Sequence, residues 1–80
     1  MTHKDVWDMI EMMATAHGKT VSGLARCSGL DATTFNKSKR FTKEGQERWP
    51  STHSISKILA ATNSNFMGMV KIYIKNVKKG

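Results

Sequence analysis

Residues 32–40 carry polar and basic side chains of the kinds that form hydrogen bonds with the edges of DNA bases. If residues 32–39 form a helix with Phe35 pointing inward, the turn of about 100° per residue places a polar set of side chains on the outer face. In the major groove, Asn pairs with adenine, Lys and Arg pair with guanine, and a Thr methyl group contacts the thymine methyl. The outer face therefore predicts base contacts by Thr33, Asn36, Lys37 and Arg40. The alternative is a solvated polar face without a ligand, as on most exposed helices.

The charge distribution favours a polyanionic partner for the same region. The chain has 80 residues, with 13 Lys and Arg against 6 Asp and Glu, and a formal net charge of +7. Residues 1–18 hold one base and three acids, residues 19–50 seven bases and three acids, and residues 51–80 five bases and no acid. A basic surface gains affinity for nucleic acid because neutralised phosphates release condensed counterions. From charge alone, a basic surface without a partner is an equal alternative.

Further residues that flank the outer face are suited to phosphate groups. Basic side chains, and the amides and hydroxyls at the start of a helix, bind phosphate oxygens beside the groove. We predict phosphate contacts by Thr20, Lys39, Lys43, Arg48, Ser51 and Thr52. The segment from Arg40 to Pro50 is long for a loop in so small a domain, which favours such a role. Trp49 is expected to be a hydrophobic plug under this loop rather than a base-stacking platform.

The elements around these residues have the pattern of a helix-turn-helix over residues 20–40. Two short helices cross at a steep angle in this motif, so one residue inside the first helix must be small and the turn must accept a positive φ. Ala25 and Gly29 meet these two requirements four residues apart. The apolar side chains that lock the pair of helices to the rest of the domain are those of Leu24, Leu30 and Phe35. Ser38 departs from the pattern, and a purely structural helical hairpin is the alternative.

Apolar residues spaced three and four apart, together with capping residues, predict an all-α fold in one domain over residues 1–74. The expected helices cover residues 4–17, 21–28, 32–39, 52–62 and 66–74, with N-caps at Thr20, Asp31, Ser51 and Asn65. Gly18 and Asn63 are expected to take the left-handed conformation that ends a helix. Residues 70–77 are rich in β-branched side chains, so an extended conformation is an alternative there. Residues 40–50 read as an exposed irregular loop, and residues 75–80 as a frayed basic tail.

Over about residues 4–72, the chain resembles the phage-repressor-like (lambda-repressor-type) helix-turn-helix proteins of bacteria and their viruses. The resemblance rests on Val6-Trp7 with Ile10, His17-Gly18, Ser22-Gly23-Leu24-Ala25-Arg26, Gly29-Leu30-Asp31, Thr33-Thr34-Phe35-Asn36-Lys37-Ser38-Lys39-Arg40, Arg48-Trp49-Pro50-Ser51-Thr52 and Ile55-Lys57-Leu59-Ala60-Ala61-Thr62. This combination is similar to the N-terminal half of bacterial repressors that continue into a serine-peptidase-like domain.

That resemblance implies a compact five-helix domain, a recognition helix at residues 32–39 and a dimer on a two-fold operator. Two positions depart from the family pattern, since Asn63 stands where glycine is usual and Met67-Gly68 replaces an acidic pair. The peptidase half is absent from the 80 residues, so self-cleavage is not implied.

The expected function is that of a sequence-specific double-stranded DNA-binding transcriptional regulator, acting as a repressor in the bacterial cytoplasm. A homodimer is expected through Phe66, Met69, Val70 and Tyr73, whose spacing gives the last helix an apolar stripe. One alternative is an antitoxin-like protein-interaction module with the same fold. Another is the DNA-binding fragment of a longer self-cleaving repressor.

Other functional classes have little support in the sequence. The three histidines lie on separate predicted elements without ligand spacing, and Cys27 has no evident base beside it, so we expect no enzyme, metal site, cofactor or small-molecule substrate. No apolar run approaches the roughly 20 residues that span a bilayer. Residues 1–8 lack the apolar core of a signal peptide, from which a cytoplasmic location is expected. A basic helix lying on a membrane surface, at residues 71–79, is a minor alternative.

Overall fold

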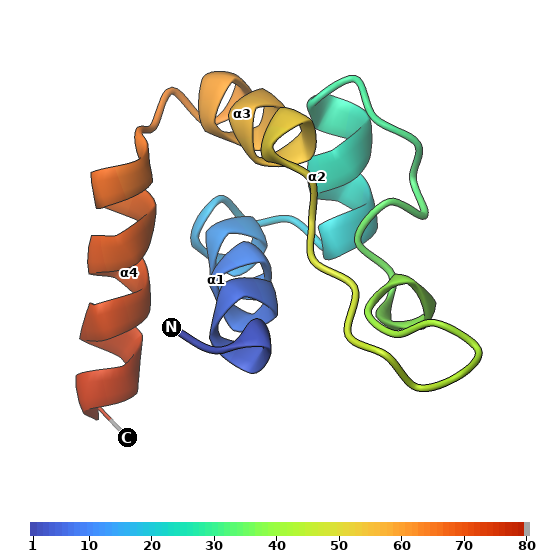
Figure 1. Ribbon diagram of the computed structural model, residues 1–80. Helices are drawn as coiled ribbons and strands as arrows, with labels where there is room; N and C mark the ends of the chain where they lie inside the picture. The colour runs from blue at the N-terminus through green and yellow to red at the C-terminus, as the bar shows by residue number, and fades with distance from the viewer. Residues whose placement is uncertain (80) are drawn as a thin grey trace.

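The computed structural model describes the backbone of residues 1–79 and the side chains of residues 1–65 and 67–75. The α-helices are α1 (His3–Ala16), α2 (Val21–Cys27), α3 (Thr52–Ala61) and α4 (Phe66–Lys79), with a short 3-10 helix, η1 (Lys37–Lys39). Over the described backbone the only strand-like feature is an isolated bridge between Phe41 and Glu47. The expected all-α class is therefore confirmed. Figure 1 shows α1 in the middle, with α4 on one side and the segment that holds η1 on the other.

Helix α1 begins and ends at signals in its own sequence. The Thr2 hydroxyl accepts a hydrogen bond from the amide of Asp5, and the Asp5 carboxylate accepts one from the amide of Thr2, which forms a capping box. Gly18 has a φ of 66°, as predicted for the residue that follows the helix. The inward face of α1 buries Trp7, Met9, Ile10, Met13 and Ala14.

One hydrophobic core joins all four α-helices. Met13 of α1, Leu24 of α2, Ile58 of α3 and Met69 of α4 are fully buried in it, together with Phe35 from the segment that precedes η1. Since Phe35 lies outside every regular helix, its burial anchors the candidate DNA-binding segment to the rest of the domain.

Met69, one of the residues expected in the dimer contact, is buried within its own chain. Met69 has no exposed surface, and Val70 and Tyr73 pack partly buried against the core of the same chain. These residues of the predicted stripe therefore hold α4 on its own domain; Met69 has no surface left for a second copy in this conformation, whereas Val70 and Tyr73 remain partly exposed. Phe66, the remaining member of the stripe, has a side chain outside the described residues.

The expectation of one continuous α-helix over residues 32–39 is wrong. Residues 32–35 form a turn, Asn36 is extended with φ −65° and ψ 153°, and η1 follows. The Asp31 carboxylate accepts hydrogen bonds from both the amide and the hydroxyl of Thr33, and the Thr34 hydroxyl donates to the Asp31 carbonyl. The Asp31 side chain thus makes the N-cap bond that the sequence predicts, but only a turn follows it at residues 32–35. The expected five-helix arrangement therefore becomes four α-helices and one 3-10 helix.

The expected irregular loop at residues 40–50 contains an ordered hairpin over residues 40–48. The Arg48 amide donates to the Arg40 carbonyl at 2.8 Å, and the Thr42 amide donates to the Gln46 carbonyl at 2.8 Å. Gly45 closes the turn with a φ of 83°, a conformation that glycine adopts without strain. Phe41 and Glu47 pair between these bonds as the antiparallel bridge.

Helix α4 is longer than predicted. Asn65 caps it by accepting a hydrogen bond from the amide of Gly68 at 2.7 Å, as expected. The helix then continues through Ile74 to Lys79, so residues 70–77 are helical rather than extended and most of the predicted tail is ordered as helix. Residues 69–79 contain neither glycine nor proline, so nothing in the sequence ends the helix earlier. Gly80 of the predicted tail lies outside the described residues.

Candidate nucleic-acid interface

Helix α2 and the turn after it occupy the first half of the predicted helix-turn-helix. The Thr20 hydroxyl caps α2 by accepting from the amide of Gly23 at 3.1 Å, and Ala25 is fully buried. Gly29 has a φ of 77°, and the amide of Leu30 then donates to the Ala25 carbonyl at 2.9 Å. The small residue and the positive φ are thus used as the sequence predicts, although a turn and η1 replace the second helix.

The recognition segment, defined as residues 31–39, presents polar side chains outward from a buried anchor. The Phe35 ring packs edge-on against Trp7, with ring centroids 6.4 Å apart and planes at 69°. Thr33, Lys37 and Lys39 are exposed, and Asn36 is partly buried. The Asn36 side chain makes no capping hydrogen bond to η1.

Arg40 is placed differently from the other predicted base-contacting residues. Its Nη1 atom donates to Glu11 Oε2 at 3.1 Å, and its guanidinium lies 5.1 Å from the centre of the Trp7 ring. The Arg40 side chain is only 12% exposed. The Arg40 charge is therefore held against α1 by an ion pair and a cation–π contact, an arrangement that does not favour the predicted base contact.

His3 fastens the hairpin to α1, a role that the sequence did not indicate. Its Nε2 atom lies 2.9 Å from the carbonyl oxygens of both Arg40 and Arg48, the two ends of the hairpin. Trp7 Nε1 also donates to the Arg48 carbonyl, at 3.0 Å. The partners are 37 and 45 residues from His3 along the chain, so no local spacing could have identified them.

Two aromatic side chains flank His3 on the surface. The His3 ring centroid lies 4.9 Å from that of Phe41 and 5.6 Å from that of Trp49, yet Phe41 is 50% exposed and Trp49 is 53% exposed. The expectation that Trp49 is a hydrophobic plug is therefore wrong. The Trp49 and His3 rings pack nearly perpendicular, with planes at 81°, and the indole leaves about half of its surface to solvent.

A surface pocket of about 450 Å³, the Trp49 pocket, joins the recognition segment to the start of α3. The residues that line it are Trp7, Asp31, Thr33, Thr34, Phe35, Lys39, Arg48, Trp49, Pro50, Ser51 and Ser54. It brings together one predicted base-contacting residue, Thr33, and three predicted phosphate-contacting residues, Lys39, Arg48 and Ser51. The other predicted residues do not line this pocket; of these, Thr20, Lys37, Lys43 and Thr52 are exposed.

The electrostatics of the Trp49 pocket are mixed. Hydrogen bonds from the hydroxyl and the amide of Thr33 lower the pKa of Asp31, which keeps this carboxylate ionised at neutral pH. Lys39 and Arg48 supply the opposite charge, and neither forms an ion pair among the side chains that the structure describes. The Ser51 hydroxyl caps α3 by accepting from the amide of Ser54 at 3.0 Å, as predicted.

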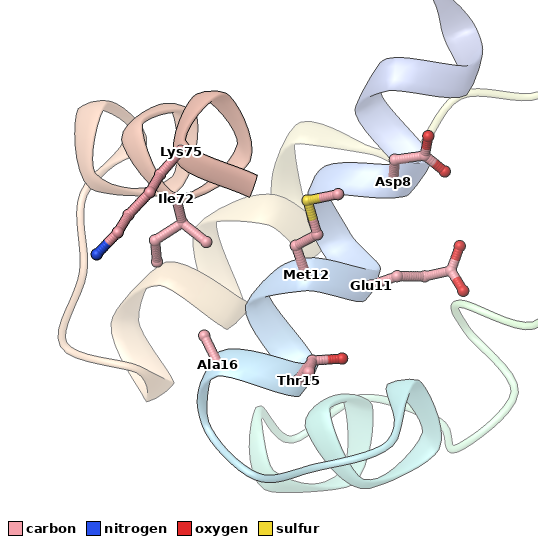
Figure 2. A pocket seen from close by; sticks show the side chains of 7 residues that line it. All are labelled: Asp8, Glu11, Met12, Thr15, Ala16, Ile72 and Lys75. Atoms are coloured by element: carbon pink, nitrogen blue, oxygen red, sulfur yellow. The ribbon is translucent and has the colours of Figure 1, made fainter. Parts of the chain in front are cut away.

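A second concave surface, the α1–α4 groove, has a volume of about 620 Å³. Asp8, Glu11, Met12, Thr15 and Ala16 line it from α1, and Ile72 and Lys75 line it from α4. In Figure 2, Ile72 extends from α4 toward α1, whereas Asp8 and Glu11 point to the side of α1 away from α4. Both carboxylates already have basic partners, Lys4 for Asp8 and Arg40 for Glu11.

Within the described side chains, no group of three or more potential metal ligands lies close enough to hold an ion. Cys27 is an exposed free thiol. None of the helices over the described residues is both long and apolar enough to cross a bilayer. No known protein family, no curated protein and no solved structure matches the chain.

Proposed function

We propose that this protein is a sequence-specific double-stranded DNA-binding regulator of transcription, acting as a repressor in the bacterial cytoplasm. The observation that carries the proposal is the recognition segment, which the buried Phe35 anchors and which opens into a pocket with Lys39 and Arg48. Hydrogen-bonding side chains beside unpaired basic ones are what a contact to base edges and phosphates requires. In this proposal Thr33, Asn36 and Lys37 read bases from the major groove.

Phosphate contacts in the proposal come from two sources around the recognition segment. Lys39, Arg48 and Ser51 line the Trp49 pocket, and the exposed Thr20, Lys43 and Thr52 extend the contact beyond it. Arg40 makes no contact with a DNA base in this proposal, because its guanidinium packs on Trp7 and Glu11. It positions the hairpin instead.

The experiment that tests sequence-specific binding is a selection of duplexes from a random pool with the purified wild-type protein. We expect enrichment of one sequence with two-fold related half-sites, whose spacing reports the geometry of a dimer. The absence of any enriched sequence would contradict sequence-specific regulation, even if the protein bound every duplex weakly.

Variants of the recognition segment separate base reading from phosphate binding. Asn36→Ala and Lys37→Ala should each cost about 1–3 kcal/mol on the selected sequence and relax the preference at one base position. Arg48→Ala should weaken binding to all duplexes alike and reduce the slope of log affinity against log salt by about 0.9. Lys57→Ala is the matched control, because Lys57 is exposed on α3 and does not line the pocket. An equal effect of Arg48→Ala and Lys57→Ala would show a general charge effect only.

The proposal includes a homodimer on the two-fold operator. With Met69 buried, the described side chains on α4 that remain exposed and apolar are Met67, at 61%, and Ile74, at 44%. They are seven residues apart, about two helical turns, and so lie on one face of α4. Sedimentation of the Met67→Asp, Ile74→Asp double variant with operator DNA should give one copy per duplex; two copies would contradict a contact through this face.

The α1–α4 groove supports a second candidate function, that of an antitoxin-like protein-interaction module. Met12 and Ile72 supply apolar surface for an amphipathic segment, and the neighbouring Asp8 and Glu11 are already paired with Lys4 and Arg40. Titration with an amphipathic Leu–Lys helical peptide should perturb the NMR signals of Met12 and Ile72, and Met12→Lys should abolish the effect. If the peptide leaves these signals unchanged, the groove offers no support for this candidate.

A further inference from the structure

We infer that the Trp49 pocket holds one sugar–phosphate unit of a DNA strand, with the Trp49 indole against the deoxyribose and Arg48 on the phosphate. This inference rests on the proposed function and adds an apolar contact to it. It begins from the exposure of Trp49, because a large aromatic side chain that leaves 53% of its surface in solvent buries more area when a partner covers it.

The surroundings of Trp49 hold the indole in place before any ligand arrives. The ring contacts His3 edge-on, with planes at 81°, and His3 is itself fixed by the carbonyl oxygens at both ends of the hairpin. Pro50 follows directly and restricts the backbone of Trp49 to extended conformations. An ordered side chain loses little conformational entropy on binding, so its contact area contributes more to affinity.

The lining of the Trp49 pocket fits a ligand that is apolar on one part and anionic on another. Trp49 and Pro50 give an apolar wall, and Arg48 and Lys39 give positive charge, whereas the Ser51 hydroxyl is engaged with the amide and hydroxyl of Ser54. Asp31 lines the same pocket and is ionised, so it repels any phosphate there, and the apolar contact with Trp49 has to add to the attraction of Arg48 and Lys39. A deoxyribose with its phosphate has the required combination of an apolar face and a charge.

The position of the pocket also fits one strand of a duplex. Thr33 lines the pocket and belongs to the segment proposed to read bases, so a strand whose bases meet Thr33 has its own backbone close by. Contacts to the sugar and phosphate set the register of a protein on the duplex but do not read sequence. Trp49 is therefore a positioning residue for the base-reading segment.

Phe41 provides a matched control for Trp49. Both side chains are about half exposed, at 50% and 53%, and both rings contact His3. Only Trp49 lines the pocket. Removing either ring disturbs the His3 packing in a similar way, but only Trp49→Ala removes the wall of the pocket.

The test measures duplex affinity for the wild type, Trp49→Ala and Phe41→Ala. We expect Trp49→Ala to weaken binding about tenfold on every duplex, with an unchanged salt slope and unchanged base preference, and Phe41→Ala to stay within about twofold of wild type. Equal affinities for the two variants would overturn the inference and leave the proposed function standing. If the wild type binds no duplex at all, the proposed function fails first. A loss in Trp49→Ala that is confined to single-stranded DNA would instead indicate base stacking and would also overturn the inference.

A measurement on the unmodified protein covers the case in which Trp49→Ala does not fold. The two indole NH groups give separate NMR signals, one from the buried Trp7 and one from the exposed Trp49. Adding a duplex that the protein binds should shift the Trp49 signal and leave the Trp7 signal nearly unchanged. An unshifted Trp49 signal in a saturated complex would overturn the inference.

Discussion

The hydroxyl of Tyr73 in α4 donates a hydrogen bond to Oδ1 of Asp5 in α1 at 2.5 Å, across 68 residues of chain. This bond joins α4 to α1 at Asp5, which also forms the capping box at the start of α1. Hydrogen bonds from the Thr2 amide and the Tyr73 hydroxyl lower the pKa of Asp5 to about 2. The bond to Asp5 raises the pKa of Tyr73 to about 12.

These pKa shifts predict losses of stability at both ends of the pH range. Asp5 ionises more readily in the folded chain, so its contribution is present above the ordinary pKa of 3.8 and is lost as the pH falls toward about 2. Tyr73 holds its proton more tightly when folded, so its contribution is present below pH 10.0 and is lost as the pH rises toward about 12. Thermal unfolding of the wild type and of Tyr73→Phe at a series of pH values measures both losses.

The Tyr73→Phe variant should lose stability less steeply than the wild type in the alkaline range, because the titrating hydroxyl is gone. In the acid range it should still lose stability, because Thr2 continues to hydrogen-bond Asp5. If the two proteins have parallel profiles above pH 10.0, the bond between Tyr73 and Asp5 does not contribute as the structure indicates.

Truncation of the two methionines on α4 should change the free energy of unfolding by very different amounts. Met69 is fully buried in the core, so Met69→Ala should lower the free energy of unfolding by about 2–5 kcal/mol through the cavity that it leaves. Met67 is 61% exposed, so Met67→Ala should change it by no more than about 0.5 kcal/mol. Urea unfolding of both variants, at a concentration where the protein is monomeric, gives the comparison. Similar losses of unfolding free energy in the two variants would contradict the burial of Met69 and the exposure of Met67.

Substitution of Arg40 should affect stability rather than base preference. Arg40→Ala removes the cation–π contact with Trp7 and the ion pair with Glu11, which together contribute about 1–2 kcal/mol. Unfolding measurements check the loss of stability, and the duplex selection checks the enriched sequence. A variant that folds with wild-type stability but prefers a different base at one position would restore the predicted base contact by Arg40.

Substitution of His3 should loosen the hairpin while α1 remains folded. His3→Ala removes the hydrogen-bonding group that faces the carbonyl oxygens of Arg40 and Arg48. Hydrogen exchange should therefore become faster at the amides of Thr42 and Arg48, which bond within the hairpin, but not at the amide of Leu24 in α2. Exchange that rises equally at all three sites would indicate general destabilisation instead of a local fastening.

Much of the helical framework was predictable because each signal lies within a few residues of its effect. The caps at Thr20, Ser51 and Asn65 form as expected. The positive φ values at Gly18 and Gly29 lie where the sequence placed them. Asn63 likewise ends α3 with a φ of 53°. Capping bonds and positive-φ turns depend on the local backbone, so the residue type carries most of the information.

The candidate site was predicted less completely than the helices. Thr33, Lys39, Arg48 and Ser51 do line one pocket. Thr33 and Lys39 were expected on a continuous helix that the structure lacks, whereas Arg48 was expected in the loop that follows and Ser51 at the N-cap of the next helix. Asp31 accepts the hydrogen bonds of a helix cap from Thr33, yet only a turn follows at residues 32–35, because a capping residue does not reveal how long the helix after it will run. The anchor, Phe35, was expected to point inward, and it is fully buried.

The sequence by itself determined the all-α class, the capped helix ends and the inward position of Phe35, because these follow from neighbouring residue types and from periodicity. Only the tertiary structure decided that His3 joins the two ends of the hairpin, that Arg40 faces Glu11 and that Trp49 stays half exposed. Each of these depends on which of several distant partners is near enough to offer a hydrogen bond, an opposite charge or a covering surface. That proximity is set when α1, the hairpin and α3 pack together, and no spacing along the chain encodes it.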